Sequence, residues 1–210
     1  MPRGVAITEP RQHLFAAAER VIAAAGPSEL TSRAVTRAGG VATGLLFAHF
    51  ANFDDFLTGY AVDRSFQIAA NAAGLPDRAG TGAVDVNLSE TLLATPLITM
   101  LAVTRLFAYR PPLAAAVDAV LGSGSAALRA LERAVVEYLV AEQHIGRLPA
   151  GADTEALAVT VVGVLHHVAL TDGEDPAAAD RIRRAITALT ASATVPGPTP
   201  NAVARSDGGS

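Results

Sequence analysis

Two breaks near the start of the chain, Gly26-Pro27 and Gly39-Gly40, constrain its fold more than any other feature. Residues 11–25, before the first break, place apolar side chains on one stripe at the 3.6-residue period, which predicts an amphipathic helix. The segments after the breaks are long enough only for short helices, at about 31–38 and 42–50. Three helices, the last two joined by a glycine turn, form the helix-turn-helix pattern.

Polar residues mark where two of the helices begin. Thr31 is a good N-cap for the second helix, with Leu30 and Val35 placed to form a hydrophobic staple around it. Asn52 is placed to cap a longer helix, and Asp54 lies in its first turn, where an acid opposes the helix dipole favourably.

The remaining residues show helical patterns and no strand pattern. Residues 74–87 are rich in Gly, Pro and Asp and are predicted to form a loop. Pro96 predicts a kink or a break in an apolar helix, with Thr95 capping the second segment. The further helices are expected at about 54–73, 88–109, 112–121, 125–145, 153–171 and 176–192.

The sequence therefore predicts an all-α fold in three parts. Residues 1–50 form an N-terminal three-helix domain with the helix-turn-helix, and residues 51–193 form a larger helical domain. Residues 194–210 have no apolar period and are expected to be a disordered tail.

Composition excludes several classes of protein. The chain has no cysteine, so a disulfide framework and a thiolate metal site are ruled out. The N-terminus lacks the apolar stretch of a signal peptide, and the most apolar run, 156–165, is far short of the ~20 residues of a membrane span. We therefore expect a soluble, cytoplasmic protein that contacts no membrane.

No pattern of residues predicts catalysis or metal binding. The segment GSGSAAL at 122–128 resembles neither a phosphate-binding loop nor a nucleophile elbow, because no strand precedes it. His166 and His167 point about 100° apart on a helix, and neither has a ligand partner four residues further on. We expect no enzymatic activity, no metal and no cofactor.

Positive charge is slightly concentrated at the N-terminal end. All 16 basic residues are arginine, and residues 1–50 hold five of them against three acids. The whole chain carries a net charge of −4. A mildly basic N-terminal domain on an acidic body is consistent with binding to the phosphates of nucleic acid, and so is an ordinary fluctuation in charge.

Residues 11–57 resemble the DNA-binding head of the TetR-like (tetracycline-repressor) regulators. The resemblance lies in AAAERVIAAAG at 16–26, in Thr31 at the start of the second helix, and in GGVATGLLFAHFANFDDFL at 39–57. The positions that match the family pattern in order are Gly40, Val41, Gly44, Leu46, His49, Phe50, Asp54 and Leu57. The body is similar only in its helical layout and in the spacing of Gln143, Gly146 and Leu148.

The resemblance implies that the helix at 42–50 enters the major groove of double-stranded DNA. The buried back of this helix is predicted to comprise Val41, Leu46, Phe47 and Phe50. The residues predicted to contact DNA are Arg33, Arg37, Thr43, Gly44, Leu45 and His49. For the two arginines the alternative is a solvated helix face, and core packing is expected for at least three of Phe47, Phe50, Phe53 and Phe56.

Four positions depart from the family pattern. Ala42 replaces the usual N-cap Ser, and Leu45 replaces a residue that is often small or hydroxylated. Phe47 and Phe53 replace the usual Tyr and Lys and remove two phosphate contacts, so we expect weaker DNA binding with a flatter salt dependence. Leu45 can pack on a thymine methyl group, and DNA shape can carry part of the specificity.

The helix at 153–171 is apolar around nearly its whole circumference and must therefore be covered on two sides. With the helix at 176–192 it is predicted to form an isologous four-helix interface with a second copy of the chain. The resemblance implies the same homodimer. The alternative is a core helix of a monomer.

The resemblance also implies a pocket in the body for a small, often apolar effector. Candidate lining residues are Met100, Leu101, Thr104, Phe107, Tyr138 and His167. Arg105 can neutralise an anionic ligand, although a salt bridge with Glu137 or Glu142 is the favoured alternative. For Met100 and Phe107, taken singly, simple core packing is the favoured alternative.

These features predict a ligand-responsive transcriptional regulator, a repressor that binds a palindromic operator as a homodimer and is released by a small, apolar effector. The alternative is a TetR-like helical dimer whose DNA binding is weakened or lost and which binds a ligand or a protein.

Overall fold

The computed structural model describes residues 8–173 and 175–193, and this part of the chain contains helices and turns but no strand, which confirms the predicted all-α fold. The predicted tail at 194–210 lies outside the described residues. The helices are α1 (Pro10–Ala25), α2 (Ser32–Ala38), α3 (Thr43–His49), α4 (Phe53–Ala72), α5 (Val84–Leu93), α6 (Leu97–Tyr109), α7 (Pro112–Leu121), α8 (Leu128–His144), α9 (Thr154–Thr171) and α10 (Ala178–Ala193).

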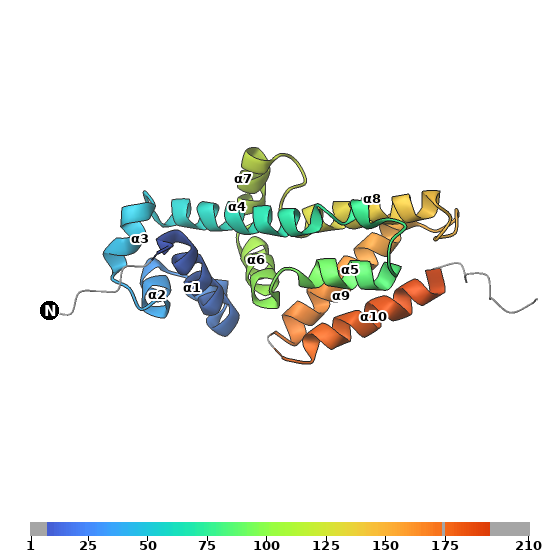
Figure 1. Ribbon diagram of the computed structural model, residues 1–210. Coiled ribbons are helices and arrows are strands. Elements are labelled where there is room, and N and C mark those ends of the chain that lie inside the picture. The colour runs from blue at the N-terminus through green and yellow to red at the C-terminus, as the bar shows by residue number, and fades with distance from the viewer. Residues whose placement is uncertain (1–7, 174, 194–210) are drawn as a thin grey trace, which may run out of the picture.

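Helices α1 to α3 form a head at one end of the molecule, and α4 runs from this head into the body (Figure 1). The two head turns rest on glycine, since Gly26 adopts φ 89° and Gly40 adopts φ 65°. Thr31 caps α2 by accepting a 3.1 Å hydrogen bond from the Ala34 backbone N–H, as predicted. Asn52 caps α4 in the same way.

A cluster of aromatic rings fixes the head to the first turns of α4. The ring of Phe15 on α1 lies 5.7 Å from that of Phe50 and 5.6 Å from that of Phe56. Phe53 stacks on Phe56 with a centroid distance of 5.6 Å. The prediction that at least three of the four phenylalanines pack in the core is confirmed, and Phe47 is the exception.

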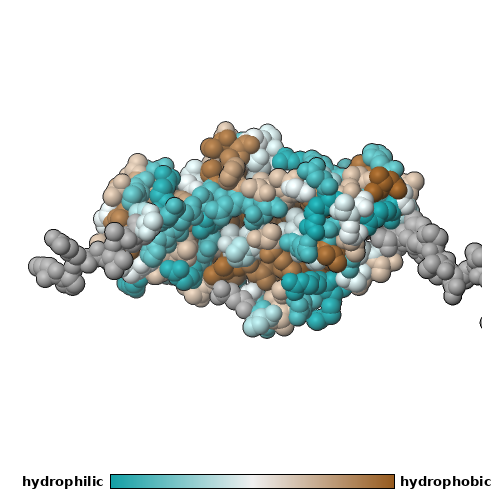
Figure 2. Space-filling view, in the orientation of Figure 1, coloured by the Kyte–Doolittle hydropathy of each residue, from teal (hydrophilic) through white to brown (hydrophobic). Residues whose placement is uncertain are grey.

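In the body, α8 packs on α9, α9 on α10, and α10 on α5. Helix α7 packs on α4 on the opposite side from α5, and Figure 2 shows an exposed apolar surface over it at the top of the view. The long α4 therefore contributes to the core of the head and to that of the body.

Between α4 and α6 the predicted break at Pro96 is confirmed, but the extent of the preceding loop and the role of Thr95 differ from the prediction. The predicted loop at 74–87 is shorter, because α5 already begins at Val84, whose side chain is buried with that of Leu88. Helices α5 and α6 meet at a 69° bend. Thr95 does not cap α6; its hydroxyl instead accepts a 2.9 Å hydrogen bond from the Asn71 side chain on α4.

Candidate DNA-binding face and effector-binding body

Helix α3 has seven residues, and two side chains hold it to the head. Leu46 and the following Phe50 are buried one turn apart, so they fill the contact with α1 and α2. Ala42 provides no side-chain cap, as the sequence predicts, and Thr43 does not replace it. The Thr43 hydroxyl lies 3.4 Å from the hydroxyl of Thr36 on α2.

The rest of α3 faces outward. Thr43, Gly44 and His49 are exposed and Leu45 is half-buried, so all four predicted contact residues of α3 remain available to a partner. Phe47 is 50% exposed, and the prediction that it belongs to the buried back is wrong. A helix turns about 100° per residue, so Phe47 points well away from the direction of Leu46, which is the residue that faces the head.

Gly44 is not required by the fold. A Cβ atom added there would meet nothing within 4 Å. Glycine in a helix costs roughly 1 kcal/mol relative to alanine. An unforced glycine in the middle of an exposed helix face is suited to close approach by another molecule.

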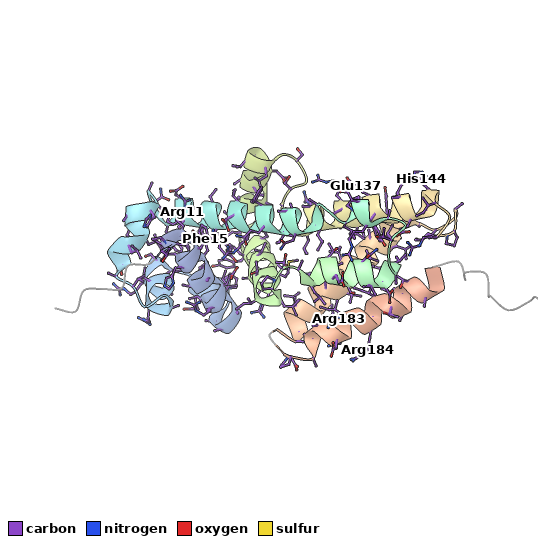
Figure 3. The ribbon with its side chains drawn as sticks, viewed as in Figure 1. Arg11, Phe15, Glu137, His144, Arg183 and Arg184 are labelled. Carbon is purple, nitrogen blue, oxygen red and sulfur yellow. The ribbon has the colours of Figure 1, made fainter. Side chains whose placement is uncertain are left out.

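Two arginines of α2 supply positive charge beside this face. Arg33 and Arg37 are exposed, and neither forms a salt bridge with a carboxylate in the described part of the chain. Arg20 instead donates a 3.0 Å hydrogen bond to the Ala38 carbonyl at the end of α2. Arg11 lies near Phe15 where the head meets α4, with its guanidinium 4.6 Å from the centroid of the Phe50 ring (Figure 3).

A buried ion pair joins α1 to α4. The Nε of Arg64 donates a 2.8 Å hydrogen bond to Glu19, and both residues are 6% exposed. Asp63 accepts 2.7 Å hydrogen bonds from Arg64 and from the amide of Gln12, which itself accepts from Arg64. Burial, followed by the charge of Glu19, raises the pKa of the neighbouring Tyr60 well above its ordinary value.

The sequence prediction missed this network, although a signal was present. Glu19 lies four residues after Phe15 and three before Ile22, on the apolar stripe of α1. A carboxylate in that position requires a buried partner.

Comparisons with known proteins agree with this geometry. The family model described as "Bacterial regulatory proteins, tetR family" matches residues 14–58, which include α2, α3 and the start of α4. The head of this chain is therefore similar to the DNA-binding head of the TetR family. No curated protein matches it in a sequence comparison.

Solved structures extend the TetR-like likeness from the head to the body. The fatty acid degradation regulator FadR from Bacillus halodurans is 16% identical, covers 88% of this chain and 96% of its own, and superposes with a TM-score of 0.64. A TetR-family regulator from Rhodococcus sp. gives 18% identity, coverage of 89% and 99%, and a TM-score of 0.63. The multidrug binding protein EbrR is 21% identical, covers 91% of this chain and 99% of its own, and superposes with a TM-score of 0.50. At these identities the likeness shows the fold.

Arg105 on helix α6 contacts the head. Its guanidinium donates hydrogen bonds of 3.3 Å and 3.2 Å to the carbonyls of Ile22 and Ala23, in the last turn of α1. The favoured alternative of a salt bridge with Glu137 or Glu142 is therefore wrong. A cation at the C-terminal end of a helix meets the negative end of its dipole and its free carbonyls.

The structure does not bring the predicted effector residues to one cavity. Met100 is buried, while Thr104 and Phe107 are half-buried on α6. Leu101 lines a cleft of about 370 Å³ between α1 and α6, together with Ile98 and Arg20. The other two lie on different helices of the body, with Tyr138 buried on α8 and His167 exposed on α9.

Tyr138 belongs to a polar cluster inside the body. Its hydroxyl accepts a 3.0 Å hydrogen bond from Asn87, and burial raises its pKa well above the ordinary value. Glu142, one turn along α8, is fully buried and pairs with Arg147 at 3.4 Å. Its second carboxylate oxygen has no hydrogen-bond partner among the described residues. The sequence prediction missed this cluster because Asn87 fell in the expected loop.

Close to this cluster the body interior is almost completely filled. A void of only about 10 Å³ is enclosed there by Val84, Leu88, Leu139, Leu148, Leu157, Val161, Leu189 and Thr190. An effector of drug size occupies roughly 300 Å³ or more, so it would enter this apolar region only if the helices separated.

Helix α9 has an apolar face that the described chain leaves uncovered. Only 33% of the helix is buried, and Val159 and Leu170 are exposed large apolar residues on it. Gly163 lies between them and has open space in front of it. By length and composition α9 could cross a membrane, contrary to the sequence prediction, although a core helix of a soluble protein meets the same criterion.

The neighbouring α10 is polar on its outer side. Arg181 forms a 2.7 Å salt bridge with Asp172, and Arg183 forms one of 2.8 Å with Asp180. Arg183 and Arg184 lie on the exposed side of the helix (Figure 3).

Within residues 8–173 and 175–193, no three His, Asp or Glu side chains lie together as metal ligands.

Proposed function

We propose that this chain is a ligand-responsive transcriptional repressor that acts in the cytoplasm and binds a palindromic operator as a homodimer. The observation that supports it best is the outward face of α3, which keeps Thr43 and Gly44 exposed at the end of a head matching the tetR family. A helix in this position can lie in the major groove while the preceding helix braces it.

In this proposal each side chain of the face has a role. Arg33 and Arg37 contact phosphates, which is consistent with their exposure and with the lack of a paired carboxylate among the described residues. Gly44 lets the α3 backbone approach the base edges, and Thr43, Leu45 and His49 contact the groove. Phosphate contacts set the affinity and its salt dependence, and the groove contacts set the sequence preference.

The homodimer forms through α9 and α10. The exposed apolar residues of α9 and the open surface at Gly163 allow two copies to approach closely. An isologous four-helix interface then places the two heads on the same side, where paired recognition helices read half-sites about one DNA turn apart. A single head with this few contacts would bind weakly.

The effector is a small, mostly apolar molecule that separates helices of the body near the cluster of Tyr138 and the filled apolar region beside it. The multidrug binding protein EbrR, which shares the fold, was solved with imidazole. Because α4 runs from this region to the head, its displacement changes the separation of the paired heads. A coupling of about 1–3 kcal/mol switches an operator that is near half-saturation.

A salt-dependent gel shift tests the DNA-binding part. The purified chain is titrated onto the DNA upstream of its own gene, and Arg33→Ala/Arg37→Ala is compared with Arg133→Ala, which removes an exposed arginine of α8. We expect the double variant alone to weaken binding to every sequence, with the log–log salt slope falling by about 0.9 for each phosphate contact removed. Unchanged binding would contradict the assigned contacts.

The apolar character of α3 favours a second candidate function. A TetR-like dimer that has lost DNA binding and that binds a ligand or a protein is consistent with Phe47 and Phe53 at positions where the family resemblance expects Tyr and Lys. This candidate is supported if the chain sediments as a dimer yet retains no DNA fragment at 50 mM salt. A chain that sediments as a monomer at micromolar concentration would contradict both candidates.

A further inference from the structure

The outward face of α3 has small residues at its centre and apolar side chains on both flanks. With Leu46 pointing inward, Gly44 and Ala48 lie closest to the opposite direction, at 100° per residue. Leu45 and Phe47 lie on either side of this small centre, and Phe47 keeps half of its surface exposed. The polar side chains of α3, Thr43 and His49, are its first and last residues and point about 60° from the direction of Leu46, so they flank the outward face rather than form it.

This surface is poorly equipped for the usual reading of base edges. Specific hydrogen bonds in the major groove come mainly from the long side chains of Arg, Lys, Asn and Gln. Helix α3 has none of these. The major groove presents one apolar group, the C5-methyl of thymine, and apolar side chains recognise it by contact.

We infer that Leu45 and Phe47 form a pair of apolar flanks that read thymine methyl groups, so that the operator half-site is selected by the positions of its C5-methyls. This inference rests on the proposed DNA binding and specifies what the face recognises. Gly44 and Ala48 bring the helix close enough for both flanks to reach the groove floor, which explains an exposed glycine that the fold does not require.

The exposure of Phe47 is the decisive observation. A phenylalanine in the core would need no partner, but this ring is half exposed in the free chain and is not one of the ring pairs of the head cluster. Burying it against methyl groups removes apolar surface from water on both partners. Each buried methyl contact is expected to strengthen binding about four-fold.

The test uses one duplex in which only the methyl groups change. A fragment bound by the full-length chain is first narrowed to its half-sites, and thymines within them are then replaced by uracil, which pairs identically but lacks the methyl. We expect binding to weaken about four-fold for each contacted methyl. Replacement by 5-bromouracil, whose bromine is close to a methyl in size, should restore the affinity. Uracil outside the half-sites is the control.

Variants assign the effect to the two side chains. Phe47→Ala and Leu45→Ala should each bind the thymine duplex less tightly and should lose part of the difference between thymine and uracil, while Arg133→Ala keeps all of it. Phe47 is exposed, so its alanine variant should fold, and circular dichroism verifies this. Phe47→Tyr keeps the ring and should therefore keep the methyl preference.

The outcomes separate this inference from the proposed function. If the chain binds its fragment but uracil and thymine duplexes bind equally, methyl reading is overturned and DNA binding stands. If uracil weakens binding equally in the wild type and in both alanine variants, a change in duplex shape causes the effect and the inference is again overturned. If no fragment binds at low salt, the proposed function fails and methyl reading fails with it.

Discussion

Two of the contacts that hold α1 in place, one with α4 and one with α6, differ in kind. Along its length α1 is joined to α4 by the buried Glu19–Arg64 pair and by the rings around Phe15. At its last turn it is joined to α6 by the hydrogen bonds of Arg105, which is only half-buried. The first contact includes buried charges and aromatic rings, and the second combines the packing of the two helices with two hydrogen bonds to backbone carbonyls.

The difference shows which parts of the molecule can move independently. A buried charge left without its partner costs several kcal/mol, so the head and the first half of α4 are expected to behave as one rigid unit. A partly exposed arginine that loses two carbonyl acceptors regains water instead. The hydrogen bonds of Arg105 are therefore expected to contribute less than the buried Glu19–Arg64 pair, and the variants below test this order of strengths.

The largest effect is expected for Arg64→Leu. The substitution leaves Glu19 buried without its partner and removes the hydrogen-bond donor of Asp63 and Gln12. The free energy of unfolding should therefore fall by about 3–5 kcal/mol. Urea denaturation followed by circular dichroism measures it. The double variant Glu19→Leu/Arg64→Met removes both charges and should recover much of the loss. A loss below 1 kcal/mol for Arg64→Leu would contradict the rigid unit.

A smaller effect is expected for Arg105→Ala. The variant loses the two hydrogen bonds to the carbonyls of Ile22 and Ala23, and the free energy of unfolding should fall by about 1–2 kcal/mol. Hydrogen exchange at the last turn of α1 should speed up, while amides between Phe15 and Glu19 remain protected. If protection is lost along all of α1, the two contacts are not separable.

A third prediction concerns alkaline pH. Burial and Glu19 raise the pKa of Tyr60 in the folded state, so the folded chain keeps the phenol neutral while the unfolded chain ionises. Stability is therefore fully present below the unfolded pKa of about 10 and is lost as the pH rises above it, by about 1.4 kcal/mol per pH unit.

Tyr60→Phe isolates this contribution. At neutral pH the change should alter the free energy of unfolding by less than about 1 kcal/mol, because the Tyr60 hydroxyl has no hydrogen-bond partner among the described residues. Between pH 10 and pH 11 the variant should lose less stability than the wild type. The wild type also contains Tyr138, whose pKa is raised, so a residual alkaline loss is expected in the variant. Identical pH profiles would rule out the assigned cause.

The smallest effect is expected for Arg110→Ala. Its guanidinium lies 2.8 Å from Asp54 in the first turn of α4, but the side chains are 44% and 81% exposed. An exposed ion pair of this kind contributes about 0.2–1 kcal/mol and weakens with salt. Thermal unfolding at 20 mM and 500 mM salt measures it. A larger loss than for Arg105→Ala would reverse the proposed order of the contacts.

The sequence predicted the fold well because apolar periodicity and caps are local signals. Thr31, Asn52 and the glycine turns determine where the head helices begin and end, and each behaves as expected. The placement of Phe47 failed because a pattern of apolar residues does not show how many side chains a seven-residue helix can bury. The partners of Arg105 could not be predicted, since backbone carbonyls 83 and 82 residues away carry no sequence signal.

The short link between α3 and α4 has a mechanical consequence. Helix α4 has 20 residues and is therefore about 30 Å long, with the recognition helix attached to one end. A rotation of about 6° at its far end displaces the near end by roughly 3 Å, which is close to the 3.4 Å rise between base pairs. A lever of this length converts a side-chain-sized movement into a shift of one step along the double helix.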